Sequence, residues 1–228
     1  NAYKAEASMR SALADAERGS GRRSVVASML APLMAAALFE RDQPAAAQAL
    51  LANRLDVIER TTLPDAVLHA HRTLACVAMQ RGDEAHALEI LNNLMALGEA
   101  RRMPRLMMTS LAEQIRLHAL RSHRQTVTRL AVALGKLGTQ FADDDHRPFR
   151  PLYELTLAVA NAYAAIGEYD FRLAETHLEA ADALATRLHR GRDALTIQVL
   201  RAVVARQHDD ARALPLLAEA MGLDLGTW

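Results

Sequence analysis

The amino-acid sequence predicts an all-α fold in which about eleven helices stack as a helix-pair solenoid. Composition is the first reason, because 51% of the residues are hydrophobic, mostly Ala and Leu, whereas only 4% are aromatic. Spacing is the second, since apolar residues such as Val67, Ala70 and Leu74 recur on one face of a helix. A repeated sequence pattern is the third. The length of 228 residues suits one helical-repeat domain over 1–228.

The individual helices follow from this periodicity and from the prolines. Pro64 and Pro104 stand directly before predicted helices, where the first turn needs no N–H donor. Pro32 is expected to kink its helix or to mark its start. Two further prolines in 139–151 predict a long loop or hinge. In order, the predicted helices span 3–18, 24–40, 44–60, 65–80, 84–97, 104–121, 124–140, 151–166, 169–189, 193–207 and 209–221.

A pattern of small and apolar residues recurs at an interval near 40 residues. The segment RGDEAHALEIL (81–91) has a counterpart in RDQPAAAQALL (41–51), and weaker counterparts follow at 122–131, 167–178 and 207–217. Each copy places a small or apolar residue where two helices would approach closely, and a second one four positions later. In the first four copies these pairs are Ala47 and Leu51, Ala87 and Leu91, Val127 and Ala131, and Ala174 and Leu178. A fixed interval combined with helical spacing predicts stacked helix pairs.

The start of each copy is interpreted as a corner between two helices. One helix ends, a residue such as Gly82 permits a left-handed turn, and Asp83 caps the next helix. Arg81-Gly82-Asp83 also matches an adhesion-receptor tripeptide. We favour the corner, because the other copies lack the tripeptide and short motif matches arise easily by chance.

Charge and cysteine content limit the classes of function. The 27 basic and 27 acidic residues give a formal net charge of zero, which argues against a surface that contacts DNA directly. The single cysteine, Cys76, cannot form an intrachain disulfide and favours a cytoplasmic location. The longest uncharged run, 24–39, contains 16 residues with a proline inside, which is too short to cross a bilayer. We therefore expect no membrane contact.

No catalytic constellation is evident, and we predict that the chain is not an enzyme. Asp143, Asp144, Asp145 and His146 form the one dense cluster of metal-ligand types. A magnesium site of the prenyl-transferring kind needs a second carboxylate cluster facing the first, and none is present, so a solvated loop is favoured and no metal is expected. ALGKLGT (133–139) lacks the glycine and hydroxyl residues of a phosphate-binding loop.

Two stretches resemble a known family. ALFERDQPAAAQALLANRLDVIER (37–60) and RTLACVAMQRGDEAHALEILNNLMALGEARRMPRLMMTSLAEQIRL (72–117) are similar to the superhelical, tetratricopeptide-like region of MalT-type regulators, large ATP-binding members of the LuxR family. The resemblance implies that the chain is a fragment of a bacterial transcriptional regulator, flanked by an ATPase domain and a helix-turn-helix domain. ATP is then expected as a cofactor of the missing N-terminal domain, and no cofactor is expected in this part.

The resemblance also implies a binding surface rather than an active site. In tetratricopeptide folds the groove is lined by first-helix residues that precede each corner. The groove candidates are His69, Arg72, Gln80, Arg116, Asn161, Gln198 and Arg206. Arg72 and Arg116 would hold an anionic or hydroxylated ligand through charge-assisted hydrogen bonds. The expected partners are a small inducer or a regulatory protein, the other domains of the polypeptide and, as a further option, a second copy of the chain. The alternative is a stand-alone scaffold that binds a peptide or protein.

Overall fold

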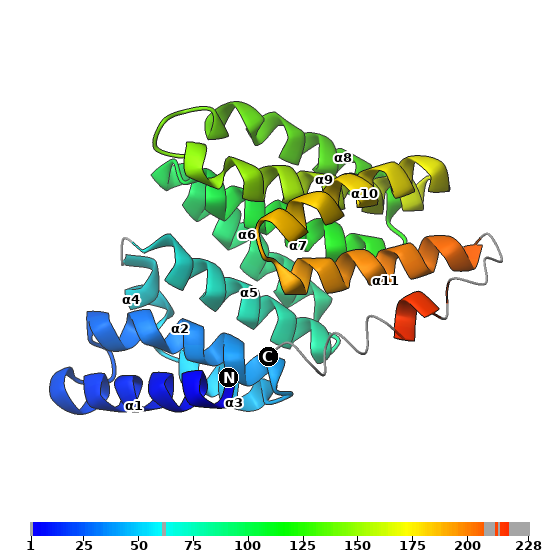
Figure 1. The fold of residues 1–228 in the computed structure, drawn as a ribbon. Coiled ribbons are helices and arrows are strands. Elements are labelled where there is room, and N and C mark those ends of the chain that lie inside the picture. Colours follow the sequence, from blue (N-terminus) through cyan, green and yellow to red (C-terminus); the bar gives the residue numbers. More distant parts are fainter. Residues whose placement is uncertain (1, 61–62, 208–212, 214, 219–228) are drawn as a thin grey trace. The chain divides into compact units, whose positions relative to one another are not determined.

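A computed structural model describes residues 2–60, 63–207, 213 and 215–218, with side chains from residue 7 onward. Figure 1 shows that the described segments consist of helices and the connections between them. Eleven α-helices and two 3₁₀ helices lie in these segments, without a strand, which confirms the predicted all-α helix-pair fold. Contacts divide the chain into two compact units, Asn1–Ser110 and Leu111–Trp228. Each unit is described by itself.

The first unit is built around helices α2 and α5. Helix α2 packs against α1, α3 and α5, and α5 packs in turn against α6. The bounds are α1 (Ala2–Ser20), α2 (Val25–Glu40), α3 (Pro44–Leu51), α4 (Leu55–Arg60), α5 (Pro64–Gln80), α6 (Glu84–Arg101) and α7 (Pro104–Leu120), whose second half belongs to the next unit. Small residues dominate the core and let the helices approach closely: Ala27, Ala31, Ala35, Ala47, Val67 and Ala70 are buried, with Leu51 and Ile58 between them.

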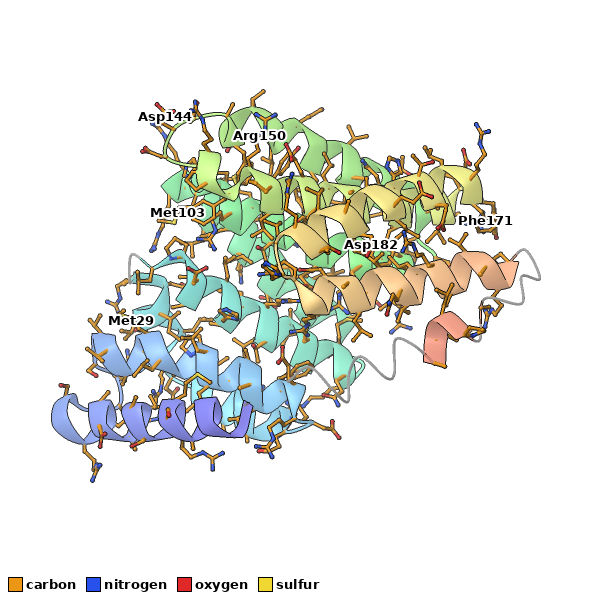
Figure 2. The ribbon with its side chains drawn as sticks, in the orientation of Figure 1. Met29, Met103, Asp144, Arg150, Phe171 and Asp182 are labelled. Atoms are coloured by element: carbon orange, nitrogen blue, oxygen red, sulfur yellow. The ribbon has the colours of Figure 1, made fainter. Side chains whose placement is uncertain are left out.

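The second unit is built around helix α9. Helix α9 packs against α8 and α10, and α10 packs against α11. The bounds are α8 (Arg124–Lys136), η1 (Leu137–Phe141), η2 (Arg147–Phe149), α9 (Arg150–Gly167), α10 (Phe171–Arg187) and α11 (Gly191–Gln207). The core again alternates small and large side chains, among them Leu155, Ala162, Ala174, Leu178, Ala181 and Ile197. An ion pair also joins α10 to α11, since Arg201 donates over 3.1 Å to Asp182, which is labelled in Figure 2.

The repeated sequence columns are core positions. All eight residues of the four pairs predicted from the 40-residue pattern, in α3, α6, α8 and α10, are buried. The second helix of each pair therefore presents a buried face with small or apolar residues at the same two positions. The fifth copy, 207–217, lies almost entirely outside the described residues.

The corners between helices share one backbone conformation. Asp42, Gly82 and Ser122, spaced 40 residues apart, have left-handed φ angles of 57°, 78° and 58°. At each, the N–H of the left-handed residue bonds to the carbonyl three residues earlier, and the next N–H bonds to the carbonyl five residues before it. This is the Schellman motif, which satisfies the last carbonyls of a helix. Arg102, Tyr169 and His189 form the same arrangement, with φ angles of 55°, 60° and 53°.

Arg81-Gly82-Asp83 forms one of these corners. Arg81 follows the last residue of α5, and Gly82 is the left-handed residue. The Asp83 carboxylate accepts the backbone N–H of His86 at 3.1 Å and so caps α6. The corner interpretation of the tripeptide is confirmed.

Several predicted helix boundaries were wrong, each for a local reason. The predicted helix 44–60 is two helices, because Asn53 adopts a left-handed φ of 59° between α3 and α4. Helix α6 continues past Gly98 to Arg101 rather than ending at residue 97. The helix predicted at 24–40 is present as α2, and of the two roles predicted for Pro32 only that of marking the helix start is excluded, because Pro32 lies inside α2. The predicted helix 209–221 falls largely outside the described residues.

The segment 139–151, expected as a long loop or hinge, lies inside the second unit. It contains the end of η1, all of η2 and the start of α9. Phe141 is buried, and its ring stacks on that of Tyr153 with 4.8 Å between centroids. The Tyr153 hydroxyl donates to the Gly135 carbonyl at 3.0 Å. These contacts attach the segment to α8 and α9.

None of the helices that the structure describes has the length and apolar character that crossing a bilayer requires.

Candidate functional site

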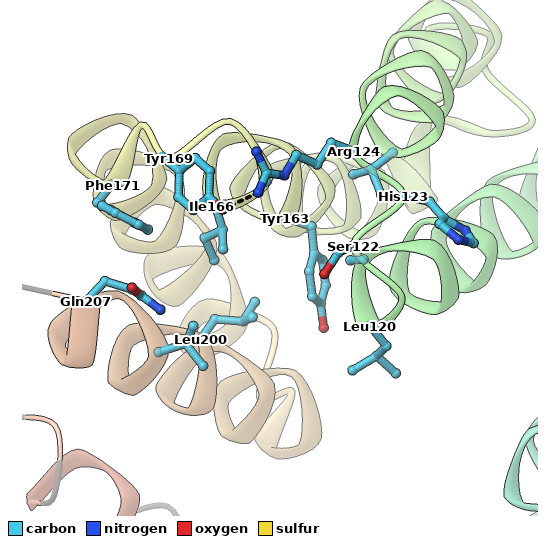
Figure 3. Close-up of a pocket in the computed structure, with 14 residues that line it drawn as sticks. Leu120, Ser122, His123, Arg124, Tyr163, Ile166, Tyr169, Phe171, Leu200 and Gln207 are labelled. Carbon is cyan, nitrogen blue, oxygen red and sulfur yellow. Dashed lines mark hydrogen bonds between the residues drawn. The ribbon is translucent and has the colours of Figure 1, made fainter.

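A pocket of about 340 Å³ opens in the second unit where the ends of several helices meet (Figure 3). The α7–α8 corner forms one wall, and the α9–α10 corner forms another. The C-terminal half of α11 closes the third side. All of its lining residues fall between residues 119 and 207, within one compact unit. Its size lies at the lower end of the range for small-molecule sites.

Most of the pocket wall is apolar. Figure 3 shows Ile166 of α9 and Leu200 of α11 facing the same space, with Leu120 at its edge. Leu120 is 66% exposed, so it forms a rim rather than a floor. The apolar lining consists of Ala119, Leu120, Val127, Ile166, Phe171, Leu200 and Val203. Such a wall binds apolar groups by removing them from water.

The rim carries a cation. Arg124, the first residue of α8, places its guanidinium carbon 4.1 Å from the centre of the Tyr169 ring. It also donates a hydrogen bond to the Tyr169 hydroxyl, drawn as a dashed line in Figure 3. Tyr169 is the left-handed residue of the α9–α10 corner. Both side chains are exposed, so this contact lies at the rim of the pocket.

Tyr163 brings a phenol into the pocket from α9. Burial raises the pKa of this hydroxyl above its ordinary value, the nearby Arg116 guanidinium acts to lower it, and the Glu113 carboxylate raises it. Glu113 and Arg116 form an ion pair on α7, with 2.8 Å between Oε2 and Nη2. The phenol thus stays protonated and can donate a hydrogen bond to a bound molecule.

His123 contributes to the pocket wall, but its ring turns away from the apolar side chains in Figure 3. Its Nδ1 lies 3.1 Å from Nδ1 of His118, so one imidazole donates to the other. Ser122 and Gln207 complete the polar lining. None of the residues that line the pocket is acidic, and the fixed positive charge among them is that of Arg124.

No protein-family model matches the chain, and a search of curated proteins returns no significant match. The all-α fold is therefore established by the structure alone. The resemblance to MalT-type regulators stays a prediction.

The seven groove candidates lie outside the wall of this pocket. In the first unit, His69 and Arg72 are half-buried on α5, and Gln80 at its end donates to Asp42 over 3.2 Å. In the second unit, Arg116 pairs with Glu113 and acts on Tyr163, so it lies behind the pocket wall. The remaining three are the half-buried Asn161 of α9, the half-buried Gln198 of α11 and the exposed Arg206 of α11. Their role in binding stays a prediction.

The residues of the pocket were not predicted, because the site candidates came from helix faces, whereas many of the pocket residues lie at helix corners. A signal was present nonetheless. Leu120 occupies the position that Glu40 and Gln80 hold 80 and 40 residues earlier, at the exposed end of a first helix. A large apolar residue there, where earlier repeats have polar ones, marks a corner with an additional role. Tyr169 gave no such signal, because its left-handed φ of 60° is known only from the structure.

The aspartate cluster and the single cysteine, both considered in the sequence as candidate sites, lie outside the pocket wall. Asp143, Asp144 and Asp145 are exposed, and Asp144, labelled in Figure 2, forms an ion pair with Arg147 at 2.8 Å. Cys76 is half-buried on α5.

Proposed function

We propose that this chain is the sensor domain of a bacterial transcriptional regulator of the MalT-like, LuxR-family type, and that a small molecule binds in the corner pocket of its second unit. The observation that carries the proposal is the pocket itself, an apolar recess of about 340 Å³ with an arginine that contacts the Tyr169 ring at its rim. The sequence resemblance supports the regulator part, and the helix-pair fold is compatible with it.

The position of the pocket suggests how binding is converted into a signal. A ligand there contacts the α7–α8 corner, the α9–α10 corner and α11 together. The ligand therefore stabilises one arrangement of these helix pairs over the others. The size of this shift is set by how much more tightly the ligand binds one arrangement than the other. In the proposed regulator this bias acts on an ATP-dependent switch in the flanking domains, in the cytoplasm. ATP would bind there and not in this chain.

Filling the pocket tests the binding proposal. Val203 lines the pocket from α11, whereas Val199, one turn earlier, is exposed and does not line it. A small-molecule library is screened for compounds that raise the melting temperature of the wild-type protein. The shift should disappear in Val203→Trp and persist in Val199→Trp. Compounds that stabilise both variants equally would place their binding elsewhere.

The regulator part needs a separate test in the complete gene. The coding sequence around this segment should contain a phosphate-binding loop upstream and a helix-turn-helix downstream. In the full-length protein, Val203→Trp should abolish the transcriptional response to a compound found in the screen, while Val199→Trp retains it. If the gene encodes neither module, the proposal that the chain belongs to a transcriptional regulator is wrong, and the proposal that the pocket binds a small molecule is unaffected.

A peptide-binding scaffold is the second candidate, and the exposed rim favours it. Leu120 is 66% and Tyr169 59% exposed, and a partner's side chains would cover both. Peptides selected from a displayed library would distinguish the two. A peptide whose binding is lost in Leu120→Ser but kept in Val203→Trp uses the rim and not the recess.

A further inference from the structure

The chemistry of the pocket limits the class of molecule that it accepts; this inference rests on the function proposed above. The recess is formed mainly by aliphatic side chains, including Ile166, Leu200 and Val203. A strongly polar ligand such as a sugar would leave many hydroxyl groups without partners against this wall, at a cost for each buried group. The body of the ligand must therefore be apolar.

The charge at the mouth has one sign. Arg124 contributes a permanent positive charge, and no carboxylate lines the pocket. A cationic ligand would be repelled by this charge, and a neutral ligand would gain nothing from it. An anionic group placed beside Arg124 forms charge-assisted hydrogen bonds, which are roughly twice as strong as neutral ones.

The geometry of Arg124 suits a carboxylate. Its guanidinium lies over the Tyr169 ring, so the ring covers one face of the group, and one N–H is directed to the Tyr169 hydroxyl. A guanidinium has five N–H donors in its plane, and one of them is directed to the Tyr169 hydroxyl, which leaves others for a planar acceptor.

The volume limits the size of the ligand. The recess of about 340 Å³ lies at the lower end of the size range of small-molecule sites. A ligand in the size range of a small metabolite therefore suits it. An unbranched carboxylate of eight to ten carbons, or an aromatic carboxylate of similar size, is in this range.

We propose that the pocket between the α7–α8 corner, the α9–α10 corner and α11 binds an amphipathic monocarboxylate, with the carboxylate on Arg124 and the apolar part against Ile166, Leu200 and Val203. Tyr163 lines the same recess, and its phenol, kept neutral by burial, is a further polar group at the wall.

The test compares three probes that share a ten-carbon chain: decanoate, decanol and decylamine, each below its aggregation concentration. Isothermal titration calorimetry of the wild-type protein should show one decanoate site, with decanol about tenfold weaker and decylamine weaker still. Arg124→Ala should bind decanoate and decanol about equally. Arg121→Ala is the matched control, because Arg121 is exposed in the same corner and does not line the pocket.

The outcomes separate this inference from the function on which it rests. Equal affinity for decanoate and decanol in the wild type, or equal loss in both arginine variants, overturns the carboxylate assignment. If Val203→Trp then still blocks binding of both probes, the pocket is a ligand site, but its ligand is not selected by a carboxylate. Decanoate binding that Val203→Trp leaves unchanged overturns both the inference and the proposed pocket. Circular dichroism checks that each variant keeps its helices.

Discussion

Arg54 is a charged side chain in the interior of the first unit, where charges are costly. It is only 1% exposed and forms an ion pair with Glu17 of α1. Its position follows from Asn53, whose left-handed turn separates α3 from α4 and directs the chain inward. A guanidinium left without its carboxylate in such a place is strongly destabilising.

We therefore expect Glu17→Ala to lower the free energy of unfolding by about 3 kcal/mol. The matched control is Asp15→Ala, which removes the ion pair between the exposed Asp15 and Arg18 and should cost less than about 0.5 kcal/mol. Urea denaturation of both variants measures the difference. Equal small effects would mean that Arg54 finds another partner or reaches water.

Tyr163 gives a pH dependence of defined sign. Its pKa in the folded protein lies above the ordinary value of about 10. Above pH 10 the unfolded chain releases this proton first, so stability is fully present below about pH 10 and decreases as the pH rises further. Tyr163→Phe removes this contribution, and its denaturation midpoint should fall less than that of the wild type between pH 9 and pH 11. Parallel pH profiles would contradict the burial of the phenol.

The helix corners are the elements that set the repeat. Six Schellman motifs end helices in the described residues, and only one of them has glycine at the left-handed position. Other residues pay about 1 kcal/mol or more for that conformation. Helix ends with a non-glycine residue at the left-handed position are therefore less stable than the same ends would be with glycine there.

We expect His189→Gly to raise the free energy of unfolding by about 0.5–1 kcal/mol, because φ at His189 is 53°. The converse variant, Gly82→Ala, should lower it by about 1 kcal/mol, since φ is 78° and no atom stands in the way of the added methyl group. Thermal denaturation of both variants provides the measurement. Effects of the same sign would show that backbone strain is not the cause.

Gly98 has a different role, because it lies inside α6 where α7 approaches. A Cβ at this position would lie 2.7 Å from Cγ and 3.0 Å from N of Met107. Gly98→Ala should therefore lower the free energy of unfolding by about 1–3 kcal/mol. Gly135→Ala, on α8 with no atom within 4 Å, should instead raise it by up to about 1 kcal/mol. A neutral Gly98→Ala would mean that Met107 moves aside freely.

At the scale of the whole molecule, the division into two compact units predicts local rather than uniform stability. Stability in helical repeats is a sum of contributions from each repeat and its neighbours. Glu17→Ala should therefore accelerate amide hydrogen exchange in α1 to α5 far more than in α8 to α11. Exchange that increases equally in both units would indicate a single cooperative domain over 1–228, as the sequence analysis expected.

The fold was largely predictable from the sequence because the signals that define it are local. The interval from Ala47 to Ala87 to Val127 specified which helix faces are buried. The break at Asn53 was not predictable, since neither glycine nor proline marks it. The pocket was missed for a different reason. Leu120, Tyr169 and Leu200 are far apart in the chain, and only the packing of α7 to α11 brings them together.

Because these corners do not require glycine, their left-handed position can carry a side chain that contacts a ligand or a neighbouring residue. The backbone at residues 42, 82, 122 and 169 follows the same course whether the side chain is carboxylate, hydrogen, hydroxymethyl or phenol. Changing the residue there leaves the helices and their buried faces in place. Substitutions at the corners can therefore change which molecules the protein binds without altering its core. Tyr169, which contacts Arg124, is an example of such a corner side chain.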